Sequence, residues 1–232
     1  MKNLGLTVIT AILMITAKSV MAQDCVFYYP DVKGAKIELT HYNDKDKITG
    51  ISRQEIVNIE KAGNTVTAYI KNEYYDNMDK LTFNNEMEVS CKDGIFYLEM
   101  NNYINEQALA GFKGMEMEIK GDNLNFPSDL KVGDKLNDGT ITISFNAPGM
   151  SMMNMSTVIK NRVVETIESI TTPAGTFKSY KISYDIETKA IMTNVTGKAV
   201  QWFSENVGMV RTESYDENGK LTGYSVLTGI QK

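Results

Sequence analysis

“ESYDENGKLTGYS” at residues 213–225 has an echo near the start of the chain, “THYNDKDKITGIS” at 40–52, and a looser one, “EYYDNMDKLTF” at 73–83. Each copy contains an Asn or Asp, then two residues, then Gly or Asp, then Lys. Asx is favoured at the first position of a type I turn, and a three-residue hairpin loop needs a residue that tolerates positive φ before the second strand. The phrase therefore predicts three similar β-hairpins, and no ligand is needed to explain it.

The predicted turns are Asp216–Lys220, Asn43–Lys47 and Asp76–Lys80. Glycine adopts positive φ freely, and Asp is among the few other residues that tolerate it. In this register each turn sets an aromatic side chain opposite an aliphatic one, a cross-strand pair that contributes about 0.2–1 kcal/mol. The expected pairs are Tyr215 with Leu221, Tyr42 with Ile48, and Tyr75 with Leu81.

Alternation of period two dominates the chain after residue 35 and predicts β-strands. The clearest segments are “TVTAYIKNEYY” (65–75), “KLTFNNEMEVSC” (80–91), “GIFYLEM” (94–100), “GTITISF” (139–145), “FKSYKISYDIETK” (177–189) and “GYSVLTGI” (223–230). Turn signals such as “KAGN” (61–64) and “NDG” (137–139) separate them. We expect an all-β fold with a strongly curved antiparallel sheet, either an open barrel or a two-layer sandwich.

Two stretches depart from this alternation. “NNYINEQALAGFKG” (101–114) predicts one short helix near 103–113, with Ile104, Ala108, Leu109 and Phe112 on one face. The irregular “NFPSDLKVGDKLNDGT” (125–140) predicts a crossover between two sets of strands. An internal boundary, if there is one, is expected near 121–138, and otherwise residues 23–232 form one domain.

The first 22 residues predict a cleaved secretory signal. Lys2 precedes an apolar run, “LGLTVITAILMITA” (4–17), and small side chains lead to an expected cleavage after Ala22. The run is short for a membrane span, which needs about 20 apolar residues, and we expect no transmembrane segment. The protein is thus predicted to be exported, either periplasmic or secreted.

Cys25 and Cys91 are the two cysteines of a chain bound for an oxidising compartment, which favours a disulfide between them. A metal or redox pair is disfavoured because neither cysteine has a CxxC partner or a histidine nearby. Gln23 and Asp24 precede Cys25 in place of the small residues of a lipoprotein signal.

Charge and motifs exclude several functions. After removal of Lys2 and Lys18 the chain has 22 basic and 29 acidic residues, a balance opposed to nucleic-acid binding. The single histidine, His41, lies beside the first hairpin without a Cys or Ser near it in sequence that would suggest catalysis. Phosphate-loop, nucleophile-elbow, zinc-protease and dinucleotide motifs are missing from the sequence. We expect no enzyme, no cofactor and no metal, although two scattered carboxylates could still form a glycosidase pair.

Methionine is unusually frequent, with 14 residues in the chain. Met150, Met152, Met153 and Met155 lie close together in “GMSMMNMS” (149–156). Thioethers are ligands for Cu(I), but no histidine or cysteine supports such a site. Met is also an adaptable apolar filler, so these four residues are candidates for plain packing or for contact with a lipophilic ligand, a peptide or a partner.

Four phrases together resemble a family of exported proteins. They are “DCVFYYP” (24–30), “FPSDLKVGDKLNDG” (126–139), “ITTPAGTFKSYKISYDIET” (170–188) and “WFSENVGMVRTESYDENGKLTGYSVLTGI” (202–230). As a set they resemble the TapB-like exported proteins of Bacteroidota, which carry a domain of unknown function. The resemblance covers essentially the whole mature chain. It implies an exported β-rich protein with paired Cys25 and Cys91, and it supplies no catalytic residues.

The sequence leaves two functional hypotheses. The first is a non-catalytic binding or carrier module for a lipophilic ligand, by analogy with curved-sheet periplasmic lipoprotein carriers and with the Met-rich segment 149–156 at its edge. The second is a structural or interaction protein of the cell envelope. An enzyme or a Met-based copper binder ranks below both.

Overall fold

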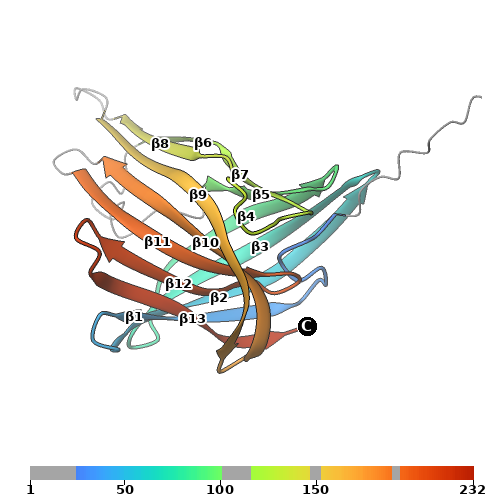
Figure 1. The fold of residues 1–232 in the computed structure, drawn as a ribbon, viewed down its shortest axis with the longest axis horizontal. Helices are drawn as coiled ribbons and strands as arrows, with labels where there is room; N and C mark the ends of the chain where they lie inside the picture. Colours follow the sequence, from blue (N-terminus) through green and yellow to red (C-terminus); the bar gives the residue numbers. More distant parts are fainter. Residues whose placement is uncertain (1–24, 101–115, 147–152, 190–193) are drawn as a thin grey trace, which may run out of the picture.

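The structure, a computed structural model, describes residues 25–100, 116–146, 153–189 and 194–232 (Figure 1). In these ranges the chain forms thirteen β-strands and no α-helix. The helix predicted near 103–113 lies outside the described residues. The strands are β1 (Lys36–Asn43), β2 (Ile48–Ala62), β3 (Thr65–Asp76), β4 (Leu81–Lys92), β5 (Ile95–Glu99), β6 (Glu116–Gly121), β7 (Asn123–Pro127), β8 (Gly139–Asn146), β9 (Met153–Thr172), β10 (Gly175–Lys189), β11 (Asn194–Ser204), β12 (Gly208–Asp216) and β13 (Leu221–Gln231).

The strands make one antiparallel sheet in the order β6-β8-β9-β10-β11-β12-β13-β1-β2-β3-β4-β5-β7. Most neighbours are consecutive in sequence, and β13 pairs with β1, so the last strand joins the first. The sheet curls around a single core, as Figure 1 shows. The prediction of an all-β, strongly curved sheet is confirmed, and of the two architectures that the sequence allowed the structure has the barrel.

The barrel is nearly closed at a seam between β6 and β7. These strands stand at the two ends of the sheet order, yet only Asp122 separates them in sequence. The Asp122 backbone N–H donates to the carbonyl of Thr140 at 2.9 Å, and its carbonyl accepts from the N–H of Met100 at 3.2 Å. Arg162 on β9 is 2% exposed and donates to the carbonyl of Asn137 at 3.0 Å. One stretch of chain therefore pairs first with β8 and then with β5, which leaves the sheet with short, protected edges.

The three repeated hairpins are confirmed in detail. Asp46, Asp79 and Gly219 have φ values of 56°, 59° and 77°. In each turn the first Asx side chain accepts two backbone N–H groups, including that of the closing lysine. The register pairs Tyr42 with Ile48, Tyr75 with Leu81, and Tyr215 with Leu221. We call the end of the barrel that carries turns 43–48, 76–81 and 216–221 the hairpin end.

The backbone carbonyl of each repeated tyrosine also lies so close to the neighbouring strand that the residue there has to be glycine. A Cβ added at Gly50 would lie 2.5 Å from the carbonyl oxygen of Tyr75. Gly223 has the same relation to the carbonyl of Tyr42, and Gly197 to that of Tyr215. The “TG” of the first and last phrases is thus explained, because the bulged strand of one hairpin approaches the next strand too closely for any side chain.

We expect Gly50→Ala to lower the free energy of unfolding by about 1–3 kcal/mol, since the new methyl group meets backbone that cannot move aside easily. Gly229→Ala is the matched control, because a Cβ there would meet the Cβ of Glu38 at an ordinary 3.4 Å. Urea unfolding of both variants measures the difference. Equal stability of the two variants would contradict this account of the close strand approach.

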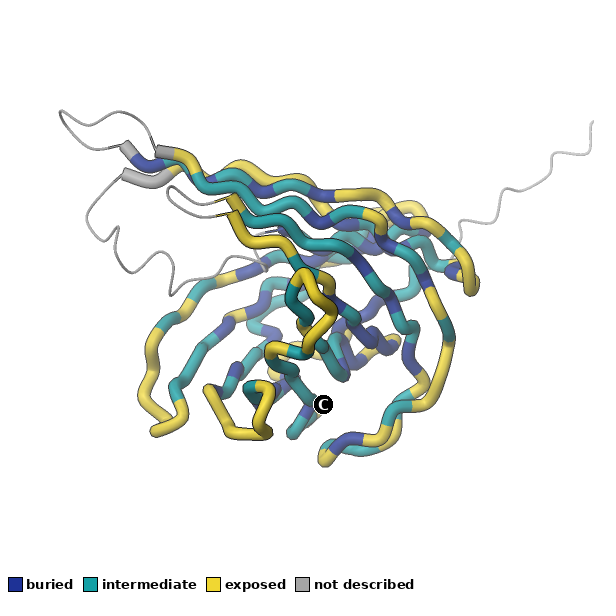
Figure 2. Tube along the Cα trace, turned by 60° about the vertical axis from the view of Figure 1, so that its left-hand side comes forward, coloured by how far each residue is buried: buried dark blue, intermediate teal, exposed yellow. Residues whose placement is uncertain are grey.

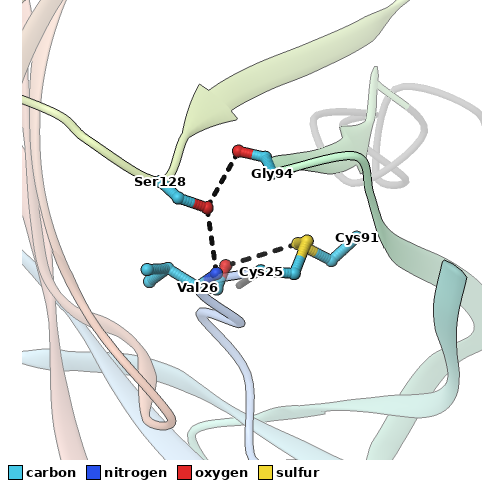
Figure 3. Close-up of a disulfide and its surroundings, with 5 residues drawn as sticks. All are labelled: Cys25, Val26, Cys91, Gly94 and Ser128. Atoms are coloured by element: carbon cyan, nitrogen blue, oxygen red, sulfur yellow. Dashed lines mark hydrogen bonds between the residues drawn. A yellow bond between two sulfur atoms is a disulfide. The ribbon is translucent and has the colours of Figure 1, made fainter. Parts of the chain in front are cut away.

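The opposite end of the barrel carries turns 62–65, 92–95 and 204–208, and we call this end the disulfide end. It is filled by the N-terminal segment, residues 25–35, which precedes β1. Cys25 is bonded to Cys91 on β4, and Ser128 accepts the N–H of Val26 at 3.0 Å (Figure 3). Tyr28 is fully buried, and its ring lies against a cluster of aromatic rings. The cluster consists of Phe96, Phe126, Tyr180 and Phe203. Buried residues follow the strands whereas exposed ones gather at the turns (Figure 2).

Candidate functional site

The inward-facing residues near the hairpin end form two different walls. Strands β12, β13 and β1–β4 present uncharged polar side chains there, at positions that share a face with the buried Leu39, Ile56 and Ile70. We call this set the polar wall: His41, Ser52, Gln54, Asn72, Asn85, Thr212 and Ser225. It lies on a part of the barrel interior where a core of this size would ordinarily be apolar.

His41 is held between two serines of the polar wall. Its Nδ1 lies 2.7 Å from the Oγ of Ser225, and its Nε2 lies 2.5 Å from the Oγ of Ser52. Burial lowers the pKa of His41 below its ordinary value, which favours the neutral ring. A neutral imidazole has one donor and one acceptor nitrogen, so one serine hydroxyl donates to the ring and the other accepts from it. The site is hydrogen-bonded and uncharged.

The lowered pKa of His41 predicts a pH-dependent stability. Above pH 6.5, the ordinary pKa of His, the ring is neutral in both states and its contribution is complete. Below that pH the unfolded chain binds a proton more readily than the folded one, so the free energy of unfolding falls until the lowered folded pKa is reached. Urea unfolding at pH 7.5 and about pH 5.5, with His41→Gln as the control, measures this. Equal pH slopes for the two proteins would contradict it.

Asn72 is the most unusual member of the polar wall. It is 1% exposed, and neither its Nδ2 nor its Oδ1 has a hydrogen-bond partner among the described residues. Asn85, directly opposite on β4, also has a buried Oδ1 without a partner, and Gln54 is opposite on β2. A buried polar group left unpaired costs about 1–3 kcal/mol. The amide row of Gln54, Asn72 and Asn85 thus has hydrogen-bonding capacity that the described residues do not use.

Strands β8–β10 lie across the barrel from the strands that carry this row (Figure 1), and their inward positions form an apolar wall. It is formed by inward residues of β8–β10: Ile141, Ile143, Phe145, Met155, Ile159, Ile182, Tyr184 and Ile186. Two threonines on the same face, Thr157 and Thr188, hydrogen-bond to each other at 3.1 Å. Of the four candidate methionines, Met155 is half-buried opposite Ile143, and the backbone of Met153 pairs with Phe145. Met150 and Met152 lie outside the described residues. The Met-rich segment therefore leads into the apolar wall through Met155.

The charged residues of β1–β3 lie on the outer face, where a groove of about 400 Å³ crosses these strands and the end of β13. Its charges are Lys36, Glu38, Arg53, Glu55, Lys71 and Glu73, three basic and three acidic. Arg53 contacts Glu38 at 3.1 Å and Asp79 at 3.0 Å, and Lys71 contacts Glu73 at 2.6 Å. Because these charges neutralise one another, we regard the groove as a solvated face and a weaker candidate than the interior.

Two features of the described part of the chain bear on other functions. Within it, no three His, Cys, Asp or Glu side chains come together in an arrangement that could hold a metal ion. The same residues contain no helix with the length and apolarity that a membrane crossing requires.

The amide row was not singled out from the sequence, although a signal was present. Alternation in “TVTAYIKNEYY” places Asn72 on the same face as Ala68 and Ile70, both fully buried in the structure. An Asn in a buried register is a departure from the apolar pattern and could have marked the site. The opposition of Asn72 and Asn85 depends on the pairing of β3 with β4.

By its fold the protein is a nearly closed antiparallel β-barrel, and a disulfide-linked segment plugs one end of it. A family model described as DUF3108-like matches residues 32–227, so the chain belongs to the DUF3108-like family. No curated protein matches the chain.

Two solved structures are similar along 90% of this chain and 100% of their own, each with a TM-score of 0.78. One is described as a candidate exported protein with a YmcC-like fold from Bacteroides fragilis, 24% identical. The other is described as a candidate lipoprotein from Parabacteroides distasonis, 25% identical. These descriptions agree with the predicted export, whereas the predicted signal segment and its cleavage after Ala22 lie outside the described residues.

Proposed function

We propose that this protein is an exported, non-catalytic carrier that holds a lipophilic ligand inside the barrel at the hairpin end. The observation that carries the proposal is the pairing of an apolar wall with an uncharged polar wall on one inner surface. Amphiphile sites need both, because apolar area supplies affinity and a few placed polar groups supply orientation. Within the DUF3108-like family, the TapB-like resemblance is the finer assignment that we propose.

Native mass spectrometry of protein purified from the envelope of its own host tests the carrier function. We expect a second mass that corresponds to a co-purified lipophile and that disappears after organic extraction. A control preparation refolded from denaturant should show the chain mass alone and regain the second mass when host lipid extract is added. A single mass from the host, unchanged by lipid extract, would overturn the proposal.

An envelope interaction protein is the second candidate, and the hairpin tips favour it. Met78 is 79% exposed, and Ile48 and Leu81 are 47% and 43% exposed at the turns of the hairpin end. Apolar side chains gathered at one end of a protein mark contact surfaces. A pull-down from envelope extract with wild-type protein and a Met78→Ser variant discriminates: a stoichiometric partner lost in the variant would support this candidate over the carrier.

A further inference from the structure

The strands that bear the amide row carry no charge on their inner face. The inward positions of β1 (37, 39, 41), β2 (50, 52, 54, 56), β3 (68, 70, 72, 74) and β4 (83, 85, 87, 89) hold no Asp, Glu, Lys or Arg. The outward positions between them carry the six charges of the outer groove. Arg162, the buried cation among the described residues, lies at the seam and binds backbone carbonyls there.

This distribution selects a ligand class. A carboxylate, phosphate or ammonium group placed against the polar wall would be desolvated without a charged partner, which is unfavourable. A hydroxyl or amide group suits it, because an Asn side chain offers both donors and an acceptor. Among the described residues, no group pairs with the amide nitrogen or the amide oxygen of Asn72, or with the amide oxygen of Asn85.

We propose that the amide row of Gln54, Asn72 and Asn85 binds the uncharged, hydroxyl- or amide-bearing head group of an amphiphile whose chain lies along the apolar wall. The inference rests on the proposed carrier function and adds head-group selectivity to it. His41, bridged by two serines, is the neutral hydrogen-bonding neighbour of this row on β1.

Asn72→Leu separates a binding role from a structural one. Leucine has the same branched arrangement of side-chain heavy atoms as asparagine, with two larger methyl groups in place of the amide, so it removes the unpaired amide without opening a cavity. If the amide row serves binding, the variant folds and loses head-group selectivity. Asn84→Leu is the matched control, because Asn84 is the exposed neighbour on the outer face of β4. Gln54→Met provides a second variant of the row should Asn72→Leu fail to fold.

The experiment is a calorimetric titration with three probes of equal chain length, each below its micelle concentration: octyl glucoside, octyl sulfate and octyltrimethylammonium. We expect the wild type and Asn84→Leu to prefer the glucoside by about tenfold or more, the difference made by one well-placed hydrogen bond. Asn72→Leu, or Gln54→Met in its place, should reduce this preference to less than about threefold.

The outcomes distinguish the two proposals. Equal binding of all three probes by the wild type would overturn the head-group inference and leave the carrier function standing. The same is true if the amide variants keep the full preference for the glucoside. Failure of every probe to bind would remove the carrier function and the inference with it.

Discussion

Replacing Cys25 and Cys91 with alanine is expected to lower the free energy of unfolding by about 4 kcal/mol. The two residues are 66 positions apart, and closing a loop of that length restricts the unfolded chain strongly. The bond also ties the N-terminal segment to β4, next to the contact of Val26 with Ser128. Urea denaturation of the wild-type protein and the double variant measures the difference.

Loss of the disulfide also has a local effect on the N-terminal segment of the folded protein. The backbone N–H of Asn206 donates to the carbonyl of Phe27 at 2.8 Å, and that of Val207 donates to Tyr28 at 3.1 Å. We expect these bonds to remain in the variant, so limited proteolysis should cut it near residue 25 before it cuts the strands. A loss below about 1 kcal/mol would show that the unfolded chain is not restricted as the chain-entropy account requires.

Phe96→Ala is expected to cost about 3–5 kcal/mol, the range for removing a buried aromatic ring. The ring is 0% exposed, and its centre lies 5.3 Å from that of Phe27, 5.4 Å from Tyr28 and 6.0 Å from Phe126. These contacts join the N-terminal segment, β5 and β7, so the resulting cavity would affect the plug and the seam together.

Tyr97→Ala provides the control for this cavity, because Tyr97 is the next residue on β5 and is half-buried on the other face. Chemical denaturation should show a smaller loss for Tyr97→Ala than for Phe96→Ala. A Phe96 variant as stable as the Tyr97 variant would mean that the aromatic cluster does not anchor the disulfide end.

The sequence predicted the hairpin turns better than it predicted how the barrel closes. The hairpins at Asn43, Asp76 and Asp216 follow from turn chemistry within a few residues, and the structure has their φ values and registers as expected. The seam at Asp122 depends instead on a backbone pairing with Thr140. Its closure also uses Arg162, which is 25 residues from Asn137, and no local pattern marks such a contact.

Of the candidate site, too, the sequence indicated one part and missed the part that depends on strand pairing. Composition drew attention to the methionines, and Met155 does lie in the apolar wall, opposite Ile143. The polar wall was missed because Asn72, Asn85 and Gln54 are ordinary residues that become unusual only when strand pairing brings them together in the interior. His41 was read from its sequence neighbours alone, whereas its contacts with Ser52 and Ser225 come from two adjacent strands.

The most direct test of the central claim, that the barrel interior at the hairpin end binds an uncharged amphiphile, is a nuclear magnetic resonance titration of the Asn72 side chain. Protein with isotope-labelled asparagine is titrated with octyl glucoside below its micelle concentration, and the Asn72 amide signals are identified by their absence from Asn72→Leu. The account predicts a saturable shift of the Asn72 and Asn85 signals, while the signal of Asn218 at an exposed turn stays unchanged. Unchanged Asn72 and Asn85 signals, with shifts only at exposed asparagines, would contradict it.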